Sequence, residues 1–354
     1  MKHVEALKVE REALEALSAL LDAIPGVQHV EVELTDLDAH VDIIAHFTFA
    51  DRPLTLICEV KSSGQPRFVR GAIYQLKHHL VTAQRNSIPL VIAPFLSEQA
   101  QAICREEQVG YLDFAGNALI AFDTVYIERT AGAQPKAEKR ALRSLFKPKS
   151  ARILRTLLRD PGPPWRVAEL AHAAGVSIGL ASSVGTALRD REWAIKTDDG
   201  LALRDPDGLL DAWAGEYEPP EGRQVRLYTH LHSAALDDAV RDAMSDHAAG
   251  RVLLGSYSAA DWLAPYARNS NRYLYADREG LAHLTEALKL TQAEKGGNVI
   301  VNIPNEDGVF ADMVRPEPGI ACTSPVQTYL DLIDGGERGR EAADHLRREL
   351  LQWH

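Results

Sequence analysis

One stretch decides the fold of the N-terminal part of the chain: residues 39–61, AHVDIIAHFTFADRPLTLICEVK. Two runs rich in β-branched and aromatic residues, 39–49 and 54–61, lie on either side of a turn segment that contains Asp51. Two such runs around a short turn predict a β-hairpin. Because successive side chains point to opposite faces of a strand, the hairpin sorts its residues into an apolar face and a mixed face.

The mixed face carries three charged side chains. A tight turn near Asp51 pairs residue 42 with about residues 59 to 61, so Asp42, Glu59 and Lys61 are expected to converge at one end of the hairpin. Two carboxylates and an ammonium held together cost stability unless they have a use. Carboxylate oxygens beside an open position suit Mg²⁺, which would polarise a phosphoryl oxygen and activate a water. Lys61 would orient that water or stabilise charge on the phosphate. An ordinary salt-bridge cluster is the alternative.

The segments around the hairpin predict a small α/β domain. Apolar residues recur at helical spacing over residues 3–23, and Pro25 ends that helix. The other expected elements are strands at 28–34 and 89–93, a helix from Pro66 to about Arg85, a helix capped by Ser97 and a strand region over 110–127. The expected order is therefore α-β-β-β-α-β-α-β.

These residues and their order resemble the PD-(D/E)xK superfamily, which includes restriction endonucleases and Holliday-junction resolvases. The resemblance covers about residues 3–126. It implies a restriction-endonuclease-like α/β domain over residues 1–128, with Mg²⁺ or Mn²⁺ as the cofactor where the site is active. The chain departs from the pattern at Val41, where the family has proline.

The resemblance also assigns the residues of the site. The implied catalytic set is Asp42, Glu59, Lys61 and Gln75. The first two would bind the metal, and Gln75 matches a glutamine on the following helix of many members. A glutamate on the first helix is also common in the family, and either Glu12 or Glu15 fits that position.

The composition is ordinary for a soluble globular protein. The chain has 354 residues, a net charge of −11 and 45% hydrophobic residues, which is enough for two or three domains. No stretch approaches the roughly 18 apolar residues of a membrane span, and no signal-peptide pattern is present, so we expect a cytoplasmic protein without membrane contact. Three widely spaced cysteines, Cys58, Cys104 and Cys322, predict buried free thiols.

Positive charge is concentrated in one region of this acidic chain. Residues 129–159 contain ten Lys or Arg and one acid, Glu138. Such a basic belt can bind nucleic acid through its local field, and a solvated linker is the alternative. The scarcity of bulky apolar side chains predicts a basic linker over residues 129–148.

The block 149–215 predicts a winged helix-turn-helix. Ser177 caps the third helix after a short turn, and the segments 193–197 and 201–204 form the wing hairpin. Small hydroxylated residues allow close approach to a DNA groove, and hydroxyl and cationic side chains reach phosphates or base edges. A helical module for protein contacts alone is the alternative. The expected DNA-binding residues are Ser177, Gly179, Ser182, Ser183, Thr186, Arg189, Lys196 and Arg152.

Residues 223–354 form a third block with α/β patterning. A Gly-Ser pair at 255–256 followed by the strand-like run 272–277 is typical of nucleotidyltransferase folds, which need two carboxylates as Asp-x-Asp to bind metal. The strand offers only Asp277, and Tyr275 stands where its partner belongs. We therefore predict a domain that resembles a degenerate nucleotidyltransferase fold and does not catalyse.

This block also resembles the C-terminal part of AbiEi-type antitoxins of type IV toxin–antitoxin systems. The residues that carry the resemblance are 255–261, GSYSAAD, the run 325–332 and the triplet 341–343. With the winged helix in the family's order, the resemblance covers about residues 149–354. It implies a DNA-binding autorepressor whose partners are double-stranded DNA and a nucleotidyltransferase toxin encoded nearby. The usual form of the family lacks a nuclease-like N-terminus.

Two functions follow from these patterns. In the first, the protein is a DNA-binding regulator: the winged helix binds an operator, the last block serves a partner or a dimer, and the N-terminal domain adds DNA contacts or conditional cleavage. In the second, it is a Mg²⁺-dependent DNA endonuclease that uses Asp42, Glu59 and Lys61. The presence of Asp42, Glu59 and Lys61 together favours the enzyme. The net negative charge and the AbiEi-like block at residues 149–354 favour the regulator. We favour the regulator and leave the enzymatic question open.

Overall fold

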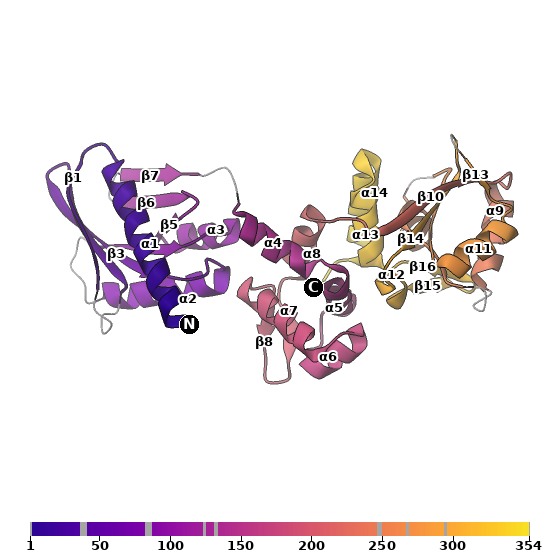
Figure 1. The fold of residues 1–354 in the computed structure, drawn as a ribbon, viewed down its shortest axis with the longest axis horizontal. Helices are drawn as coiled ribbons and strands as arrows, with labels where there is room; N and C mark the ends of the chain where they lie inside the picture. The colour runs from indigo at the N-terminus through magenta and orange to yellow at the C-terminus, as the bar shows by residue number, and fades with distance from the viewer. Residues whose placement is uncertain are drawn as a thin grey trace. The chain divides into compact units, whose positions relative to one another are not determined.

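The computed structural model describes residues 2–35, 41–81, 87–122, 125–130, 134–245, 250–266, 269–293 and 296–353. Over these residues the chain is a mixed α/β protein, as the sequence predicts. It divides into two compact units, Met1–Leu142 with Ala187–Glu192 and Arg143–Thr186 with Trp193–His354. Figure 1 traces the chain through its elements.

The first unit is built on one seven-stranded sheet whose strands follow chain order. The strands are β1 Val27–Leu34, β2 Ile43–Phe49, β3 Arg52–Val60, β4 Ser87–Ala93, β5 Gly110–Asp113, β6 Ala118–Phe122 and β7 Val125–Arg129. Strands β3, β4 and β5 are parallel, and the other neighbours are antiparallel. The predicted order of elements is confirmed, with the last strand region divided into β5, β6 and β7.

Helices cover both faces of this sheet (Figure 1). The helix α1 (Lys2–Asp22) packs its apolar stripe on the face that carries Leu56. The helices α2 (Pro66–Leu80) and α3 (Glu98–Glu106) pack on the opposite face, which carries Ile57. The predicted end of α2 near Arg85 lies outside the described residues.

The hairpin of β2 and β3 has a two-residue turn. Pairing that begins at Phe49 leaves only Ala50 and Asp51 in the turn, with φ of 49° and 59°. Two consecutive left-handed residues match the right-handed twist of the strands. Continued along the strands, the register places Asp42 opposite Glu59, within the predicted range.

The predicted basic linker is partly helical. Residues Lys136–Leu145 form helix α4, which begins directly after Pro135. The run contains no glycine or internal proline and is rich in Lys, Arg, Ala and Leu, all good helix formers. The polar, basic composition of this segment therefore reflects its solvent exposure. It does not indicate a lack of secondary structure, so the linker prediction is wrong for this helix.

Three helices and a short hairpin follow. They are α5 Pro148–Arg159, α6 Val167–Ala174, α7 Ile178–Asp190, β8 Ala194–Lys196 and β9 Leu201–Leu203, and α8 Pro206–Gly215 comes after them. Gly175 ends α6 with φ of 63°, a left-handed conformation that glycine adopts without steric cost. Leu154 and Leu158 of α5 and Val184 and Leu188 of α7 are buried, as their helical spacing predicts.

A second mixed sheet carries the C-terminal domain. Its strands are β10 Gly222–Tyr228, β11 Val252–Leu254, β12 Arg272–Ala276, β13 Thr291–Gln292, β14 Val299–Pro304, β15 Val314–Glu317 and β16 Ile320–Cys322. Their order in the sheet is β13-β10-β14-β12-β11-β16-β15. The helices are α9 Ser233–Ser245, α10 Ser256–Leu263, α11 Arg278–Ala287, α12 Gly308–Ala311, α13 Pro325–Ile333 and α14 Gly336–Leu350.

One buried arginine joins α5 to this domain. Arg155 is 5% exposed, and its Nη1 and Nη2 donate to Gln327 Oε1 and to the Gly308 carbonyl, each at 3.0 Å. Its Nε lies 3.3 Å from Asp312 Oδ1. A buried guanidinium is tolerated only when it is paired and hydrogen-bonded. The helical block and the C-terminal block, predicted as separate domains, therefore form one compact unit.

Two smaller predictions can also be compared with the structure. Cys58, Cys104 and Cys322 are buried and free, as predicted. Among the described residues, no single helix has the length and apolar content of a membrane span; α6 and α7 reach them only as a pair bent by 111°.

We expect Arg155→Met to destabilise the second unit by about 3 kcal/mol, because it leaves the Asp312 carboxylate buried without its cation. Urea unfolding of the full chain, followed by circular dichroism, measures this loss. Lys149→Met, which removes an exposed cation from the first turn of the same helix, is the matched control and should change little. Adding Asp312→Leu to Arg155→Met should recover much of the loss. Equal effects of Arg155→Met and Lys149→Met would contradict a structural role for the buried ion pair.

Candidate functional site

The predicted acidic cluster is assembled on the α2 face of the first sheet. The backbone N–H of Val60 donates to Asp42 Oδ2 at 2.7 Å. Lys61 Nζ donates to Glu59 Oε1, and also to Gln75 Oε1 at 2.9 Å. The structure thus brings together all four residues that the sequence and the resemblance selected, three from the hairpin and one from α2.

Glu59 is the buried member of this cluster, with 4% of its surface exposed. Burial raises the pKa of its carboxyl group, and the nearby charge of Asp42 adds to this, while the hydrogen bond and positive charge of Lys61 act in the opposite direction. A buried carboxylate beside a second carboxylate is an unfavourable arrangement unless a cation shares it. Lys61 supplies such a charge to Glu59, and a metal ion would supply a further one to both carboxylates.

The oxygen atoms of the cluster fit a hard divalent cation. Asp42 Oδ1 and Glu59 Oε2 make no hydrogen bond to any described residue, so each carboxylate keeps one oxygen available. Mg²⁺ typically takes one or two carboxylates and completes its shell with water and phosphate oxygens. In the described part of the chain, no third Asp, Glu, His or Cys completes a metal-binding group. Asp42 and Glu59 would therefore hold such a cation with open positions, at which it would polarise a phosphoryl oxygen.

The first-helix glutamates lie elsewhere. Glu12 and Glu15 are both exposed on α1, which packs on the face opposite α2. Glu12 instead lies 3.6 Å from Lys8 of the same helix. The structure therefore brings neither glutamate to Asp42 and Glu59.

Most of the predicted DNA-binding residues share the outer face of α7. Ser177 Oγ accepts the Leu180 N–H at 3.3 Å, which confirms it as the N-cap of the helix. Arg189 is half-buried and already interacts within the protein. The exposed members of the set are Ser177 at the N-cap, Gly179, Ser182, Ser183 and Thr186 on α7, and Lys196 on β8.

Arg152 has a different position from the rest of this set. It lies on α5, is half-buried, and its Nη2 is 3.4 Å from Glu306 Oε2 of the C-terminal domain. Its charge therefore contributes to the packing of α5 on that domain, and the structure does not bring it to the outer face of α7.

The C-terminal domain contains a pocket of about 690 Å³ that sequence reasoning did not identify. Its floor includes Tyr217, Tyr275 and Asp331. The two hydroxyls donate to the Asp331 carboxylate, from Tyr217 at 2.5 Å and from Tyr275 at 3.0 and 3.1 Å. Gly255 permits this arrangement, because a Cβ there would lie 2.7 Å from the Tyr275 ring. The sequence had marked Tyr275 only as a missing carboxylate.

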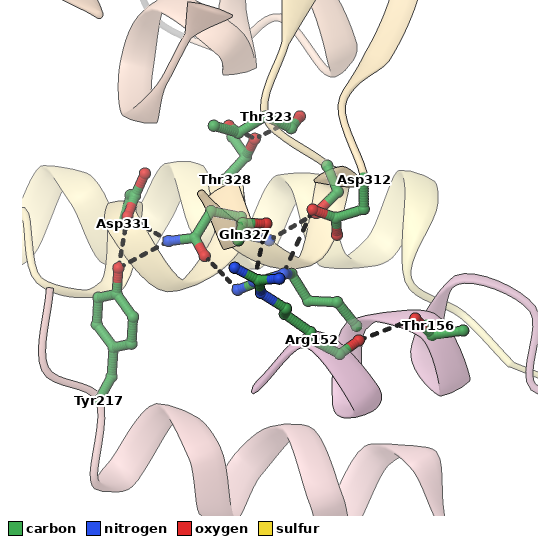
Figure 2. A network of polar contacts seen from close by, with 11 residues as sticks. Arg152, Thr156, Tyr217, Asp312, Thr323, Gln327, Thr328 and Asp331 are labelled. Carbon is green, nitrogen blue, oxygen red and sulfur yellow. Dashed lines mark hydrogen bonds and ion pairs between the residues drawn. The ribbon is translucent and has the colours of Figure 1, made fainter. Parts of the chain in front are cut away.

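Gln327 connects this floor to Arg155 of α5. Its Nε2 donates to Asp331 Oδ1 and to the Tyr217 hydroxyl, each at 2.9 Å, while its Oε1 accepts from Arg155. Because a guanidinium only donates, the amide has one possible orientation. Figure 2 shows the bonds that Tyr217 and Gln327 donate to Asp331, and Tyr275 donates to the same carboxylate.

Asp277, the single carboxylate of the predicted strand 272–277, follows β12 and is the N-cap of helix α11. Its Oδ1 accepts the Gly280 N–H at 2.8 Å at the start of α11, and its Oδ2 binds Arg251 Nε at 2.8 Å. These bonds occupy both oxygens. Asp277 therefore has a structural role, as the cap of α11 and the partner of Arg251.

In a comparison with known families, residues 202–352 match a family model of transcriptional regulators. The family is described as the AbiEi antitoxin of a type IV toxin–antitoxin system. This match confirms the predicted resemblance over those residues and agrees with the expected role as a regulator. It begins at β9 and covers α8 and the whole second sheet.

Other comparisons add little. A solved structure of EndoMS in apo form is similar to 29% of this chain, with 13% sequence identity and a TM-score of 0.22. The match spans 45% of the length of the EndoMS chain. No curated protein matches the sequence. The interpretation of the acidic cluster therefore depends on the contacts described above, and not on these comparisons.

The buried carboxylate of Asp331 predicts a pH-dependent stability. Burial raises its pKa to about 6, and the hydrogen bonds from Tyr217, Gln327, Tyr275 and the Ser256 N–H only partly offset this. Since the folded state favours the protonated form, the stabilisation is complete below about pH 4 and is lost as the pH rises through 6. Relative to Asp331→Asn, the wild-type free energy of unfolding should fall by about 2 kcal/mol between pH 4 and 7.

Urea unfolding at a series of pH values measures this difference. The control is Asp334→Asn, which removes an exposed carboxylate one turn away and should give a nearly constant difference from wild type. A flat profile for Asp331→Asn would show that Asp331 is ionised at no cost in the folded protein.

Proposed function

We propose that the protein is a DNA-binding regulator of the AbiEi antitoxin type. In this proposal α5 to β9 act as a winged helix-turn-helix, and the C-terminal domain, built like a degenerate nucleotidyltransferase fold, serves a toxin partner. The family match over residues 202–352 supports the regulator. The arrangement of Gly255-Ser256 at the start of α10, with Tyr275 on the neighbouring strand, supports the likeness to a nucleotidyltransferase fold.

The exposed face of α7 is the observation that carries DNA binding. Gly179, Ser182, Ser183 and Thr186 are exposed on one side of the helix, while Val184 packs inward. A Cβ placed at Gly179 would meet nothing within 4 Å, so this side of the helix is open. Small and hydroxylated side chains let a helix approach a groove and donate to phosphates or base edges.

The hairpin that follows α7 supports the same proposal. Strands β8 and β9 pair through three residues each, and Lys196 is exposed on β8. Gly200, with φ of 147°, closes the hairpin against Trp165, where a Cβ would lie 2.3 Å from the Trp165 carbonyl. In a winged helix-turn-helix, a cation on this hairpin would contact the DNA backbone next to the recognition helix.

We expect Ser182→Asp with Ser183→Asp to weaken binding to the DNA upstream of the protein's own gene by about tenfold or more, because the new carboxylates face phosphates. Fluorescence anisotropy at several salt concentrations measures the affinity. Thr285→Asp, at an exposed position on α11, adds the same kind of charge at a distance and should bind as wild type does. If the double variant keeps wild-type affinity, α7 is not the DNA-binding helix.

A second function is favoured by the acidic cluster. We propose that Asp42 and Glu59 hold Mg²⁺ or Mn²⁺. In this proposal the N-terminal domain, as a restriction-endonuclease-like fold, hydrolyses DNA phosphodiesters when the metal is bound. The support is the joint position of Asp42, Glu59, Lys61 and Gln75, with one oxygen of each carboxylate available. Lys61 would stabilise the charge that develops on the phosphate, and Gln75 would hold Lys61 in place.

Plasmid DNA incubated with the purified protein and Mg²⁺ or Mn²⁺ tests this activity. Wild type should nick or cut the plasmid, and Lys61→Ala should reduce the rate roughly 100-fold or more, the usual cost of losing one transition-state donor. Glu59→Gln should act similarly because it removes a metal ligand. Glu12→Gln, on the opposite face of the sheet, is the control for an exposed glutamate. The nuclease proposal fails if wild type leaves the plasmid intact or if all variants cut equally.

A further inference from the structure

The C-terminal pocket has the size and lining of a small-molecule site. Its volume of about 690 Å³ lies within the range of roughly 300–1,000 Å³ that is usual for such sites. Strands β10, β12 and β14 and helices α10, α13 and α14 all contribute to its wall. Neither the regulator nor the nuclease proposed above makes use of it.

The floor of the pocket disfavours a polyphosphate. A helix N-terminus normally attracts an anion, but the N–H of Ser256 at the start of α10 already donates to the Asp331 carboxylate. Asp331 thus takes the place at which a phosphate would bind. Asp334 and Glu341 also line the pocket and would repel a highly charged chain. Tyr273 and Tyr275 on β12 supply hydroxyls rather than carboxylates, so this strand offers no ligands for a divalent cation.

The walls suit a flat aromatic ring. Tyr257 and Tyr273 line the pocket, are both half-buried, and have ring centroids 5.5 Å apart at an interplanar angle of 43°. Side chains of this kind stack on bases with little regard to which base it is. They provide an aromatic surface in the lining of the pocket.

Two amide side chains give the pocket an adjacent hydrogen-bond donor and acceptor. Gln224 Nε2 donates to Asn302 Oδ1 at 2.9 Å. This bond leaves Gln224 Oε1 as an acceptor and Asn302 Nδ2 as a donor, side by side on neighbouring strands. An adjacent donor and acceptor match the polar edge of a nucleobase, as amide side chains do with adenine.

Two arginines at the rim complete the site. Arg226 of β10 and Arg338 of α14 line the pocket and are exposed. Among the described residues, neither forms an ion pair, whereas Arg241, Arg251 and Arg272 of the same domain do. One or two available guanidinium groups suit a single phosphate.

We propose that this pocket binds a nucleoside monophosphate without a metal ion. The base stacks on Tyr273 and meets the amides of Gln224 and Asn302, and the phosphate binds Arg226 and Arg338. The proposal is independent of DNA binding and of nuclease activity, because no residue of the acidic cluster or of α7 lines the pocket.

Isothermal titration calorimetry on the full chain tests the proposal. The probes are the four common ribonucleoside monophosphates, the matching nucleosides, inorganic phosphate, and ATP with and without Mg²⁺. At least one monophosphate should bind, more tightly than its nucleoside and than ATP, with no change when EDTA is present. Absence of binding by every monophosphate, or binding that depends on Mg²⁺, would overturn it.

Variants locate the site. Tyr273→Ala should weaken the monophosphate about tenfold or more, whereas Tyr273→Phe keeps the ring and should stay within about threefold of wild type. Arg338→Ala should abolish the advantage of the monophosphate over its nucleoside, and Arg315→Ala, exposed on β15, should leave it unchanged. A thermal melt of each variant checks folding. Wild-type affinity in Tyr273→Ala would place the ligand elsewhere and overturn the assignment.

Discussion

The burial of charge is the constraint on which both units of this protein depend. In the second unit, Arg155 is 5% exposed and needs every contact that α12 and α13 supply, so α5 is fixed to the C-terminal domain. In the first unit, Glu59 is 4% exposed and Lys61 is drawn to it. Neither arrangement is the most stable one available, since apolar residues of similar size would avoid the cost of desolvation. Each instead fixes the position of its neighbours, and these neighbours form the candidate sites.

The acidic cluster was predictable because its determinants are local. Strand alternation and one tight turn suffice to place Asp42, Glu59 and Lys61 on one face, and both can be recognised in the sequence. Gln75 came from the family resemblance, because no periodicity relates a helix position to a strand in another layer. Neither Glu12 nor Glu15 joins the site because α1 packs on the opposite face of the sheet, and the order of elements alone does not determine which face a helix covers.

The second unit was less predictable because its key contacts join distant residues. Tyr217 and Asp331 are 114 positions apart, and Arg155 and Gln327 are 172 apart. In the sequence, Arg155 belongs to the basic belt, where exposed cations are expected. In the structure it is buried and bonded to the C-terminal domain, so its burial determines its role. The belt itself contains helix α4, since composition indicates exposure more directly than secondary structure. The features recovered in detail are local ones: the helical spacing inside α5 and α7, the Ser177 N-cap and the short hairpin of β8 and β9.

The fixed orientation of the Gln327 amide has an energetic consequence. Its oxygen must face Arg155, so its nitrogen must face Asp331 and Tyr217, and the amide cannot turn without leaving a donor or a carboxylate unsatisfied. The pocket floor and α5 therefore share one hydrogen-bond network. Their contributions to stability are non-additive, as is general for residues within one network. A substitution in the wall of this ligand-sized cavity is therefore expected to change the energetic contribution of α5, and a substitution in α5 that of the cavity wall.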